Sequence, residues 1–482
     1  MEYRIVKRRK TKKYVIVDEK GKVISQEFDW ISDKGLIDGS SIYYIAERYG
    51  KKAIFDKDGN RITPEWFDDI LTYGLVEGKS NYYIAKKNRK YAIFDVNGNR
   101  ISDWFDRIEP DCLVEGKGDY YITGKNYDAI FNIYRYAIFN KDGNQISPDW
   151  FYEIKKDGLI KGNSDFYIAS KSFGKNAIFD KNGRQISEWF HEIYPEGLVM
   201  GQSKYYIAWD GGFAIFDIDG NMISPEWFDD IRTDGLVLGE SKYYVAQKGG
   251  KYGRKDGKCA IFDVDGNMIT KEWYDGIETD GLVSGDSDYF IAIKNGKSAI
   301  FDKDGNRISD WYDWIYPEGL VWGQCDYYIV RENRKYAIFH KDGKMISPDW
   351  FDEIYSDGLV RGESSLYVVA KDDKYAIFDK DGNQITKEWF DYICPDGLVR
   401  GDNDYYIACN GEECAVYYKN GQKVSDDFSR NYIKKAEKIN FNENLGIVEL
   451  FDKNGNLIES IDFNPIYPFK EEIIDYTKLL NI

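Results

Sequence analysis

The sequence predicts an all-β protein, built as a tandem array of about twelve β-meander repeats of roughly 39 residues, either open and superhelical or propeller-like. Two observations predict this class. A string of the type Ala-Ile-Phe-Asp-x-Asp-Gly-Asn recurs along the whole chain. Aromatic residues make up 17% of the 482 residues and 45 Gly accompany only 10 Pro, a balance typical of short strands joined by glycine turns.

Each repeat is marked by one turn glycine, and nine of these glycines are followed by a motif tryptophan. The glycines are Gly21, Gly59, Gly98, Gly143, Gly183, Gly220, Gly266, Gly305, Gly343, Gly382, Gly421 and Gly455. The copies at Gly21, Gly421 and Gly455 lack the tryptophan, as expected of caps. We therefore predict an N-terminal capping repeat over 1–45, the array over 46–425, and a degenerate repeat with a C-terminal cap over 426–482.

Within a repeat, residues 82–85 and 91–95 are β-rich runs and are expected to pair as two strands. The following turn, exemplified by 56–60, has the chemistry of a tight hairpin, with the first Asp accepting from the turn backbone and Gly in a left-handed conformation. A third strand is expected over 61–63, then a corner over 64–68. The motif tryptophan, for example Trp227, is expected in the core, and the spacing predicts a short capping helix over 470–480.

Composition restricts the possible functions. The net charge of −17 lacks the electrostatic signature of a nucleic-acid-binding protein, and no apolar run is long enough to span a membrane. With no apolar leader at the N-terminus, we expect a soluble, cytoplasmic protein. The six Cys form no regular framework and are expected to be free thiols. Two isolated His allow no His-based triad, and the Asp-rich turns are interpreted as hairpins rather than metal sites. We predict no catalytic residues, metal or cofactor.

The order Ile-Ser-Pro-x-Trp-Phe-Asp, Gly-Leu-Val and Tyr-Ala-Ile-Phe-Asp-Lys-Asp-Gly resembles the bacterial WG-type β repeat (WG/KWG repeat-containing family) over roughly residues 3–460. The chain departs from that pattern in two respects: Ala replaces the second Gly of the family's Tyr-Gly or Trp-Gly pair, and each unit is a few residues longer. The resemblance implies an interaction scaffold without general catalytic residues.

Three features that vary between repeats are candidate partner-binding positions. The residue after Gly-Leu-Val changes along the chain from acidic through apolar to basic, and includes Met200, Leu238, Trp322, Arg361 and Arg400. Two insertions lengthen the loop between the first two strands, and insertions in repeat arrays often lie on the binding face. The first, 123–135, contains Tyr127, Phe131 and Tyr134; the second, 248–258, contains Lys248, Lys251, Arg254, Lys255 and Lys258. Neutral drift and solvated loops are the alternative interpretations.

Two functional hypotheses follow. The first is a non-enzymatic β-repeat scaffold that mediates protein–protein interaction through these positions. The alternative is a carbohydrate or cell-wall binding module, in which recurring pairs such as Tyr82-Tyr83 would offer repeated aromatic sites. Because neighbouring residues of a strand face opposite sides, one ring of each pair should pack between repeats and the other should lie nearer the surface. Nucleic acid would be reached only through the local basic loops.

Overall fold

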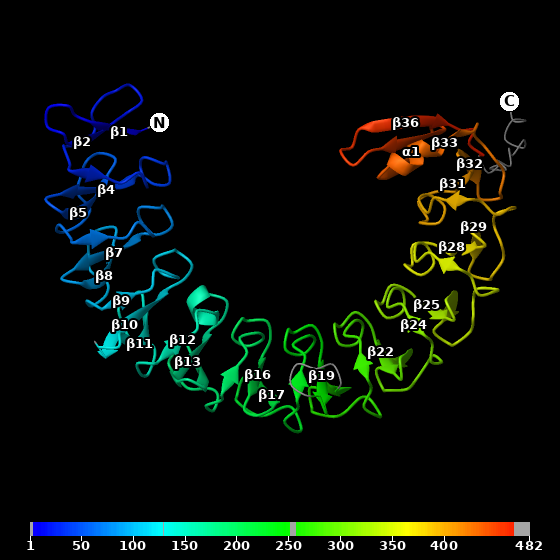
Figure 1. Ribbon diagram of the computed structural model, residues 1–482, viewed down its shortest axis with the longest axis horizontal. Helices are drawn as coiled ribbons and strands as arrows, with labels where there is room; N and C mark the ends of the chain where they lie inside the picture. Colours follow the sequence, from blue (N-terminus) through cyan, green and yellow to red (C-terminus); the bar gives the residue numbers. More distant parts are fainter. Residues whose placement is uncertain (1–2, 129, 251–256, 467–482) are drawn as a thin grey trace, which may run out of the picture. The chain divides into compact units, whose positions relative to one another are not determined.

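The computed structural model describes residues 3–128, 130–250 and 257–466, which form a series of small antiparallel sheets (Figure 1). These ranges contain twelve sheets, of which ten have three strands, one has two and one has four. Each of the twelve turn glycines follows a strand of a different sheet. The all-β tandem array predicted from the sequence is therefore confirmed.

The chain divides into two compact units, each described here by itself. Unit 1 comprises Met1–Gly253 and Phe262–Asn267, and unit 2 comprises Arg254–Ile261 and Met268–Ile482. The boundaries predicted from the sequence, at 45/46 and 425/426, stay a prediction. Among the described residues, no helix has the length and apolar character needed to cross a bilayer.

The strands of unit 1 occur in groups that each form one sheet. They are β1 (Arg4–Lys7), β2 (Tyr14–Val17), β3 (Trp30–Ile31), β4 (Tyr43–Arg48), β5 (Lys51–Asp56), β6 (Asp69–Ile70), β7 (Tyr82–Lys87), β8 (Lys90–Asp95), β9 (Arg107–Ile108), β10 (Tyr120–Asp128), β11 (Ile133–Asn140), β12 (Glu153–Ile154), β13 (Phe166–Ser172), β14 (Lys175–Asp180), β15 (Glu192–Ile193), β16 (Tyr205–Trp209), β17 (Phe213–Asp217), β18 (Asp230–Ile231) and β19 (Tyr243–Lys248), with the 3-10 helix η1 (Gly158–Lys161).

β20 (Lys258–Asp263) has residues in both units. The strands of unit 2 are β21 (Gly276–Ile277), β22 (Tyr289–Lys294), β23 (Lys297–Asp302), β24 (Trp314–Ile315), β25 (Tyr327–Glu332), β26 (Lys335–His340), β27 (Glu353–Ile354), β28 (Leu366–Lys371), β29 (Lys374–Asp379), β30 (Tyr392–Ile393), β31 (Tyr405–Asn410), β32 (Glu413–Tyr418), β33 (Phe428–Ser429), β34 (Lys438–Asn442), β35 (Ile447–Phe451) and β36 (Leu457–Asp462), with the helix α1 (Arg430–Lys435).

A typical sheet has the order β6-β7-β8, in which the short strand β6 precedes the two longer ones. The two long strands are those predicted from the sequence, but the expected third strand at 61–63 is wrong. There, a single bridge pairs Phe55 with Arg61, and Ile62 donates one further bond to the Ile54 carbonyl. Pro64 follows and has no N–H with which to continue the ladder.

The hairpin turn predicted after the second long strand is confirmed. One carboxylate oxygen of Asp56 accepts hydrogen bonds from the backbone N–H groups of Asp58, at 3.0 Å, and Asn60, at 2.8 Å. Gly59 has φ +84°, a conformation that favours glycine. The recurring carboxylate therefore serves the turn itself.

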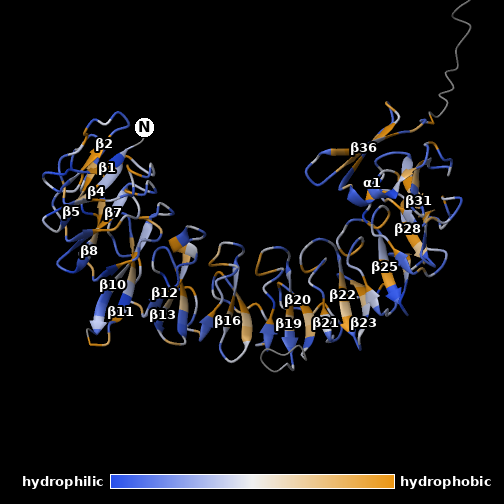
Figure 2. Ribbon diagram, turned by 45° about the horizontal axis from the view of Figure 1, so that its top comes forward, coloured by the Kyte–Doolittle hydropathy of each residue, from blue (hydrophilic) through white to orange (hydrophobic). Residues whose placement is uncertain are grey.

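The two faces of a sheet pack against different neighbours, and the strands accordingly carry the apolar segments in Figure 2. Tyr83 and Phe94 of the β7–β8 pair contact Ile54 of the preceding sheet, whereas Ile84 and Ile93 pack toward the following one. Alternating side chains of one strand thus serve two interfaces. This arrangement explains why Ala-Ile-Phe recurs as a unit.

The prediction that the motif tryptophan belongs to the core is wrong for Trp227, whose side chain is 39% exposed. The next residue, Phe228, is the buried one, at 1% exposure. Trp227 instead covers the edge of the packing, with its ring 6.1 Å from Phe190 and 5.9 Å from Phe216, measured between centroids. Its neighbour Phe228 lies toward the core because adjacent residues face opposite ways.

The expectation that all cysteines are free is also wrong, because a disulfide joins Cys409 and Cys414. These residues lie directly opposite each other on β31 and β32, which places the two side chains on one face. The sequence spacing of five residues gave no CxxC signal. The helix predicted at 470–480 lies outside the described residues, and the short helix α1 was not predicted.

Candidate functional site

The repeat between Gly98 and Gly143 is irregular and belongs to unit 1. It spans 45 residues and differs from its neighbours at both ends of β10. β10 has nine residues, so Tyr120 at its start and Asp128 at its end lie about 26 Å apart at the usual strand rise. Each end carries a separate surface feature.

At the far end of β10, the β10–β11 hairpin projects an exposed apolar tip. A regular hairpin such as β7–β8 has six-residue strands closed by the two residues Asn88 and Arg89, whereas β10 and β11 have nine and eight residues. Tyr127 is 74% exposed and Phe131 is 73% exposed. The tip is drawn in the hydrophobic colour in Figure 2. Of the three aromatic residues predicted here, only Tyr134 is half-buried.

Arg135 ties this hairpin to the next sheet. Its guanidinium carbon lies 5.4 Å from the ring centroid of Tyr127 and 5.7 Å from that of Tyr152. Its Nη1 donates to the carbonyl oxygen of Lys171 at 2.8 Å. Phe173, 89% exposed, lies in the β13–β14 turn just beyond Lys171. Exposed aromatic side chains from two successive repeats are thereby held in one surface.

A hollow of about 620 Å³ opens beside this hairpin. Its lining includes Lys125, Arg135, Lys171, Tyr127 and Trp150, together with Asn126 and Asp149. The ammonium of Lys125 lies 4.1 Å from the ring centroid of Trp150, and that of Lys171 lies 4.3 Å from the centroid of Trp189. The site therefore combines three cations with aromatic rings.

Comparison between repeats shows that these cations are unusual. In other repeats, the lysine equivalent to Lys125 and Lys171 pairs with the carboxylate 22 residues before it. Examples are Lys87–Glu65 at 2.5 Å, Lys294–Glu272 at 2.6 Å and Lys371–Asp349 at 2.7 Å. Within the described ranges, Lys125, Arg135 and Lys171 form no ion pair. Cations without a carboxylate partner remain available to an external anion.

At the near end of β10, the second feature interrupts a series of contacts between successive Gly-Leu-Val loops. In a regular repeat, a serine hydroxyl donates to a carbonyl of the next loop, and we call this contact the serine clip. Ser41 donates to Val76 at 2.7 Å and Ser80 donates to Val114 at 2.6 Å. Gly118 occupies the serine position in the irregular repeat, so this repeat has no hydroxyl to make the contact.

The loss of the serine is coupled to a second substitution, Cys112. Other repeats have glycine at this position, for example Gly74, where an added Cβ would meet the Tyr82 carbonyl oxygen at 2.3 Å. Cys112 is 1% exposed and keeps the positive φ, +72°. A Cβ on Gly118 would lie 2.8 Å from the Cys112 sulfur, so the thiol occupies the room that a serine would need. Burial raises the pKa of this thiol.

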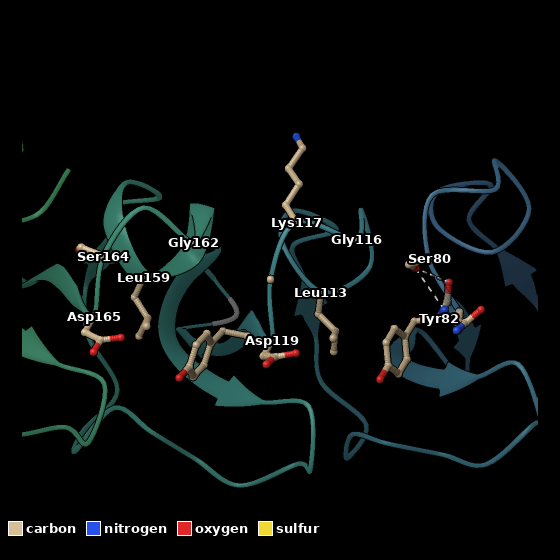
Figure 3. Close-up of a pocket in the computed structure, with 13 residues that line it drawn as sticks. Ser80, Tyr82, Leu113, Gly116, Lys117, Asp119, Leu159, Gly162, Ser164 and Asp165 are labelled. Atoms are coloured by element: carbon tan, nitrogen blue, oxygen red, sulfur yellow. Dashed lines mark hydrogen bonds between the residues drawn. The ribbon is translucent and has the colours of Figure 1, made fainter. Parts of the chain in front are cut away.

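A hollow of about 860 Å³ lies at this interruption (Figure 3). It is lined by Ser80, Asn81, Tyr82, Leu113, Gly116, Lys117, Gly118, Asp119, Tyr120, Leu159, Gly162, Ser164 and Asp165. Figure 3 shows Asp119 between Tyr82 on one side and Asp165 on the other, while Lys117 points away from them. Asp119 pairs with Lys141 at 3.2 Å and Asp165 pairs with Lys181 at 2.8 Å.

Sequence reasoning found the hairpin but missed this hollow. Its signal was present as two substitutions within one repeat, Cys112 for glycine and Gly118 for serine. Tyrosine pairs alone did not indicate it. The second tyrosine of a pair, such as Tyr83, is fully buried, and the first, such as Tyr82, is half-buried. The expected division between packing and surface is confirmed for most pairs, but Tyr243 and Tyr405, the first members of two pairs, are buried as well. The described pairs form no exposed ladder of rings.

The variable position after Gly-Leu-Val lies at the surface of each unit. In unit 1, Met200 and Leu238 are half-buried. In unit 2, Trp322 is 39% exposed. Arg361 and Arg400 are exposed, but both guanidinium groups pair with Asp357, at 2.7 and 3.2 Å. The expected basic end of this stripe is therefore largely neutralised within the chain.

The basic insertion after β19 is only partly described. Lys248 pairs with Glu226 at 2.5 Å, and Lys258 pairs with Asp275. Each of these two lysines therefore has a carboxylate partner within the chain. Lys251, Arg254 and Lys255 lie outside the described residues.

Comparison with known proteins gives no family assignment. No family model matches the chain, and no curated protein matches it. Solved structures similar to it include Hsv2p of Kluyveromyces lactis, with 12% identity, a TM-score of 0.23, and coverage of 64% of this chain and 98% of that one. AztD of Citrobacter koseri has 9% identity, a TM-score of 0.22 and coverage of 78% and 92%. BamB of Moraxella catarrhalis has 15% identity, a TM-score of 0.20 and coverage of 60% and 86%.

Proposed function

We propose that this protein is a non-enzymatic β-repeat scaffold that binds another protein through the β10–β11 hairpin of unit 1. The observation that carries the proposal is the exposed tip, where Tyr127, Ile130 and Phe131 are each more than 70% exposed. Clustered exposed aromatic side chains are typical of protein interaction sites, where such residues dominate the binding energy. The carboxylates of the chain recur from repeat to repeat as turn and ion-pair groups, which supports a structural rather than a catalytic role for them.

The partner is proposed to present an acidic segment to this surface. Among the residues that the structure describes, Lys125, Arg135 and Lys171 have no carboxylate partner, although the chain carries a net charge of −17. Cations next to aromatic rings can bind carboxylates through charge-assisted hydrogen bonds, while the ring faces bind apolar groups. An acidic peptide that contains an aromatic residue satisfies both.

Membership of the WG-type repeat family and a cytoplasmic location are part of the same proposal. The first is supported by the recurring motif. The second is supported by the free thiols of Cys112, Cys325 and Cys394. Both cysteines of the Cys409–Cys414 disulfide are no more than 1% exposed, which shields this bond from soluble reductants.

Shortening the hairpin tests the proposal. Residues 126–134 are replaced by Asn-Gly, the turn that closes β22–β23 at Asn295 and Gly296. Affinity capture of the tagged chain from its native lysate, followed by mass spectrometry, should recover one stoichiometric protein with the wild type. The shortened variant should capture at least about tenfold less of this partner protein, because it lacks the aromatic anchors. Equal recovery of the partner by the wild type and the shortened variant would show that the hairpin does not bind it.

A matched pair of lysine variants tests the charge. Lys125→Gln with Lys171→Gln removes two unpaired cations, whereas Lys87→Gln with Lys371→Gln removes two cations at the same repeat position that already pair with carboxylates. Only the first pair should weaken capture and reduce its dependence on salt. If both pairs weaken capture to the same extent, net charge rather than this site governs binding.

A further inference from the structure

We propose that the hollow at Gly118 is a separate binding site for an uncharged, hydroxyl-rich ligand of the sugar type. It lies at the start of β10, whereas the proposed protein-binding hairpin lies at the end of this strand. The volume of about 860 Å³ falls in the usual range of ligand sites. This site does not depend on the proposed scaffold function.

The polar groups of the hollow are arranged to accept hydrogen bonds. Asp119 engages Lys141 through Oδ1, and Asp165 engages Lys181 through Oδ2, so each carboxylate keeps a second oxygen outside its ion pair. The hydrogen bonds that the two lysine ammonium groups donate to these carboxylates raise the pKa of both lysines, so the pairs are ionised at neutral pH. The side-chain amide of Asn81 adds a donor and an acceptor.

The apolar groups supply flat surfaces beside these acceptors. Tyr82 and Tyr120 occupy equivalent positions one repeat apart, and both are half-buried. Burial raises the pKa of Tyr120, so its phenol stays protonated and can donate. Rings beside carboxylate and amide oxygens match the two surfaces of a sugar, its C–H face and its hydroxyl groups.

The same lining disfavours other ligand classes. An anion would meet the carboxylates of Asp119 and Asp165, and an apolar ligand would bury those carboxylates without replacing their hydration. Lys141 and Lys181 already neutralise the two negative charges, which leaves little attraction for a cation. An uncharged ligand with many hydroxyl donors avoids all three costs.

Glycine in place of serine at position 118 removes both the clip and the side chain that fills this place in other repeats, which explains why the site is here. Unit 2 has a related hollow of about 480 Å³ at Asn403, which also stands where other repeats have serine. There, however, Leu366 replaces the first tyrosine, and Glu443 adds a carboxylate. Only the hollow at Gly118, of these two, has both rings.

Restoring the regular repeat provides the test. The double variant Cys112→Gly with Gly118→Ser recreates the Gly and Ser found in neighbouring repeats, so the new hydroxyl can donate to the Ile160 carbonyl and close the gap. Cys112→Gly alone removes the thiol and leaves the hollow open. Asn81→Lys is a second way to fill it, and this repeat position already carries Lys204 and Lys242.

The assay screens the full chain on an array of neutral and acidic oligosaccharides and measures the strongest neutral binder by calorimetry. Wild type and Cys112→Gly should bind with equal affinity, and the double variant and Asn81→Lys should each lose at least tenfold. Asp326→Lys, the equivalent change in unit 2, should have no effect. Absence of neutral binding by the wild type, or equal binding by the filled variants, would overturn the proposal. Neither result bears on protein capture by the hairpin.

Discussion

The coupling between Cys112 and Gly118 gives a stability prediction that needs no ligand. Cys112→Gly relieves a positive φ of +72°, which costs a side-chain-bearing residue about 1–2 kcal/mol, but gives up a buried thiol and adds chain entropy. Its net effect should be near zero. Gly118→Ser alone places a Cβ 2.8 Å from the Cys112 sulfur, and overpacking of this kind costs about 1–3 kcal/mol.

In the double variant the clash is gone and the serine clip to Ile160 forms. A hydrogen bond of this kind contributes about 0.5–1.5 kcal/mol, so the double variant should be slightly more stable than the wild type. The favourable coupling energy between the two sites should then be about 1.5–4.5 kcal/mol. The converse change in the adjacent repeat, Ser80→Gly, removes a 2.6 Å clip and should destabilise.

Repeat arrays can unfold in segments, so the measurement must be local as well as global. Urea unfolding followed by far-ultraviolet circular dichroism gives the midpoint. Hydrogen exchange of peptides covering 105–125 reports the opening free energy of this repeat. If the effects of the two single variants simply add, the thiol does not occupy the serine's place and the reasoning is refuted.

Three further predictions concern the repeat scaffold, each measured by urea unfolding. Phe228→Ala should cost about 3–5 kcal/mol, and Trp227→Ala should cost less because solvent fills the space left by a side chain that is 39% exposed; the reverse order would show that the tryptophan is the core residue. Tyr83→Phe should be neutral or stabilising, because its buried hydroxyl has no partner among the described residues and Phe290 already occupies the equivalent position. A clear loss of stability would contradict this. The pKa of Asp68 is lowered by hydrogen bonds from a lysine ammonium and a backbone N–H, so its contribution to folding stability is present above the ordinary value of 3.8 and is lost as pH falls through the lowered pKa. Asp68→Asn should therefore make stability depend less on pH in the acid range. An unchanged pH profile would show that the Asp68 carboxylate does not contribute to this dependence.

The fold could be predicted from the sequence because each sheet is local. All three strands of a typical sheet come from consecutive residues, so a recurring string specifies a recurring sheet. The assignment of burial failed at Trp227 and Phe228 for a related reason. Two adjacent aromatic residues must face opposite ways, and the string alone does not say which one faces the neighbouring sheet.

The candidate sites were predictable to different degrees. An insertion is visible as a change of period, so Tyr127 and Phe131 were found from the sequence. The pairing of Arg361 and Arg400 with Asp357 was not, since Asp357 and Arg400 belong to successive loops whose contact depends on the stacking of repeats. The sequence of charges at the variable position therefore predicted more cations available to a partner than the structure contains.

Because the scaffold consists of many similar repeats, it can tolerate the alteration of a single repeat. Each repeat packs only against its neighbours, so the positive φ of Cys112, the lost serine clip and the long hairpin perturb two interfaces rather than the whole array. The two alterations lie about 26 Å apart, at opposite ends of the rigid strand β10. The two proposed ligands would therefore not compete for space, and shortening the hairpin should leave the affinity of the Gly118 hollow unchanged. Loss of both activities in the shortened variant would instead show that β10 depends on its tip for order.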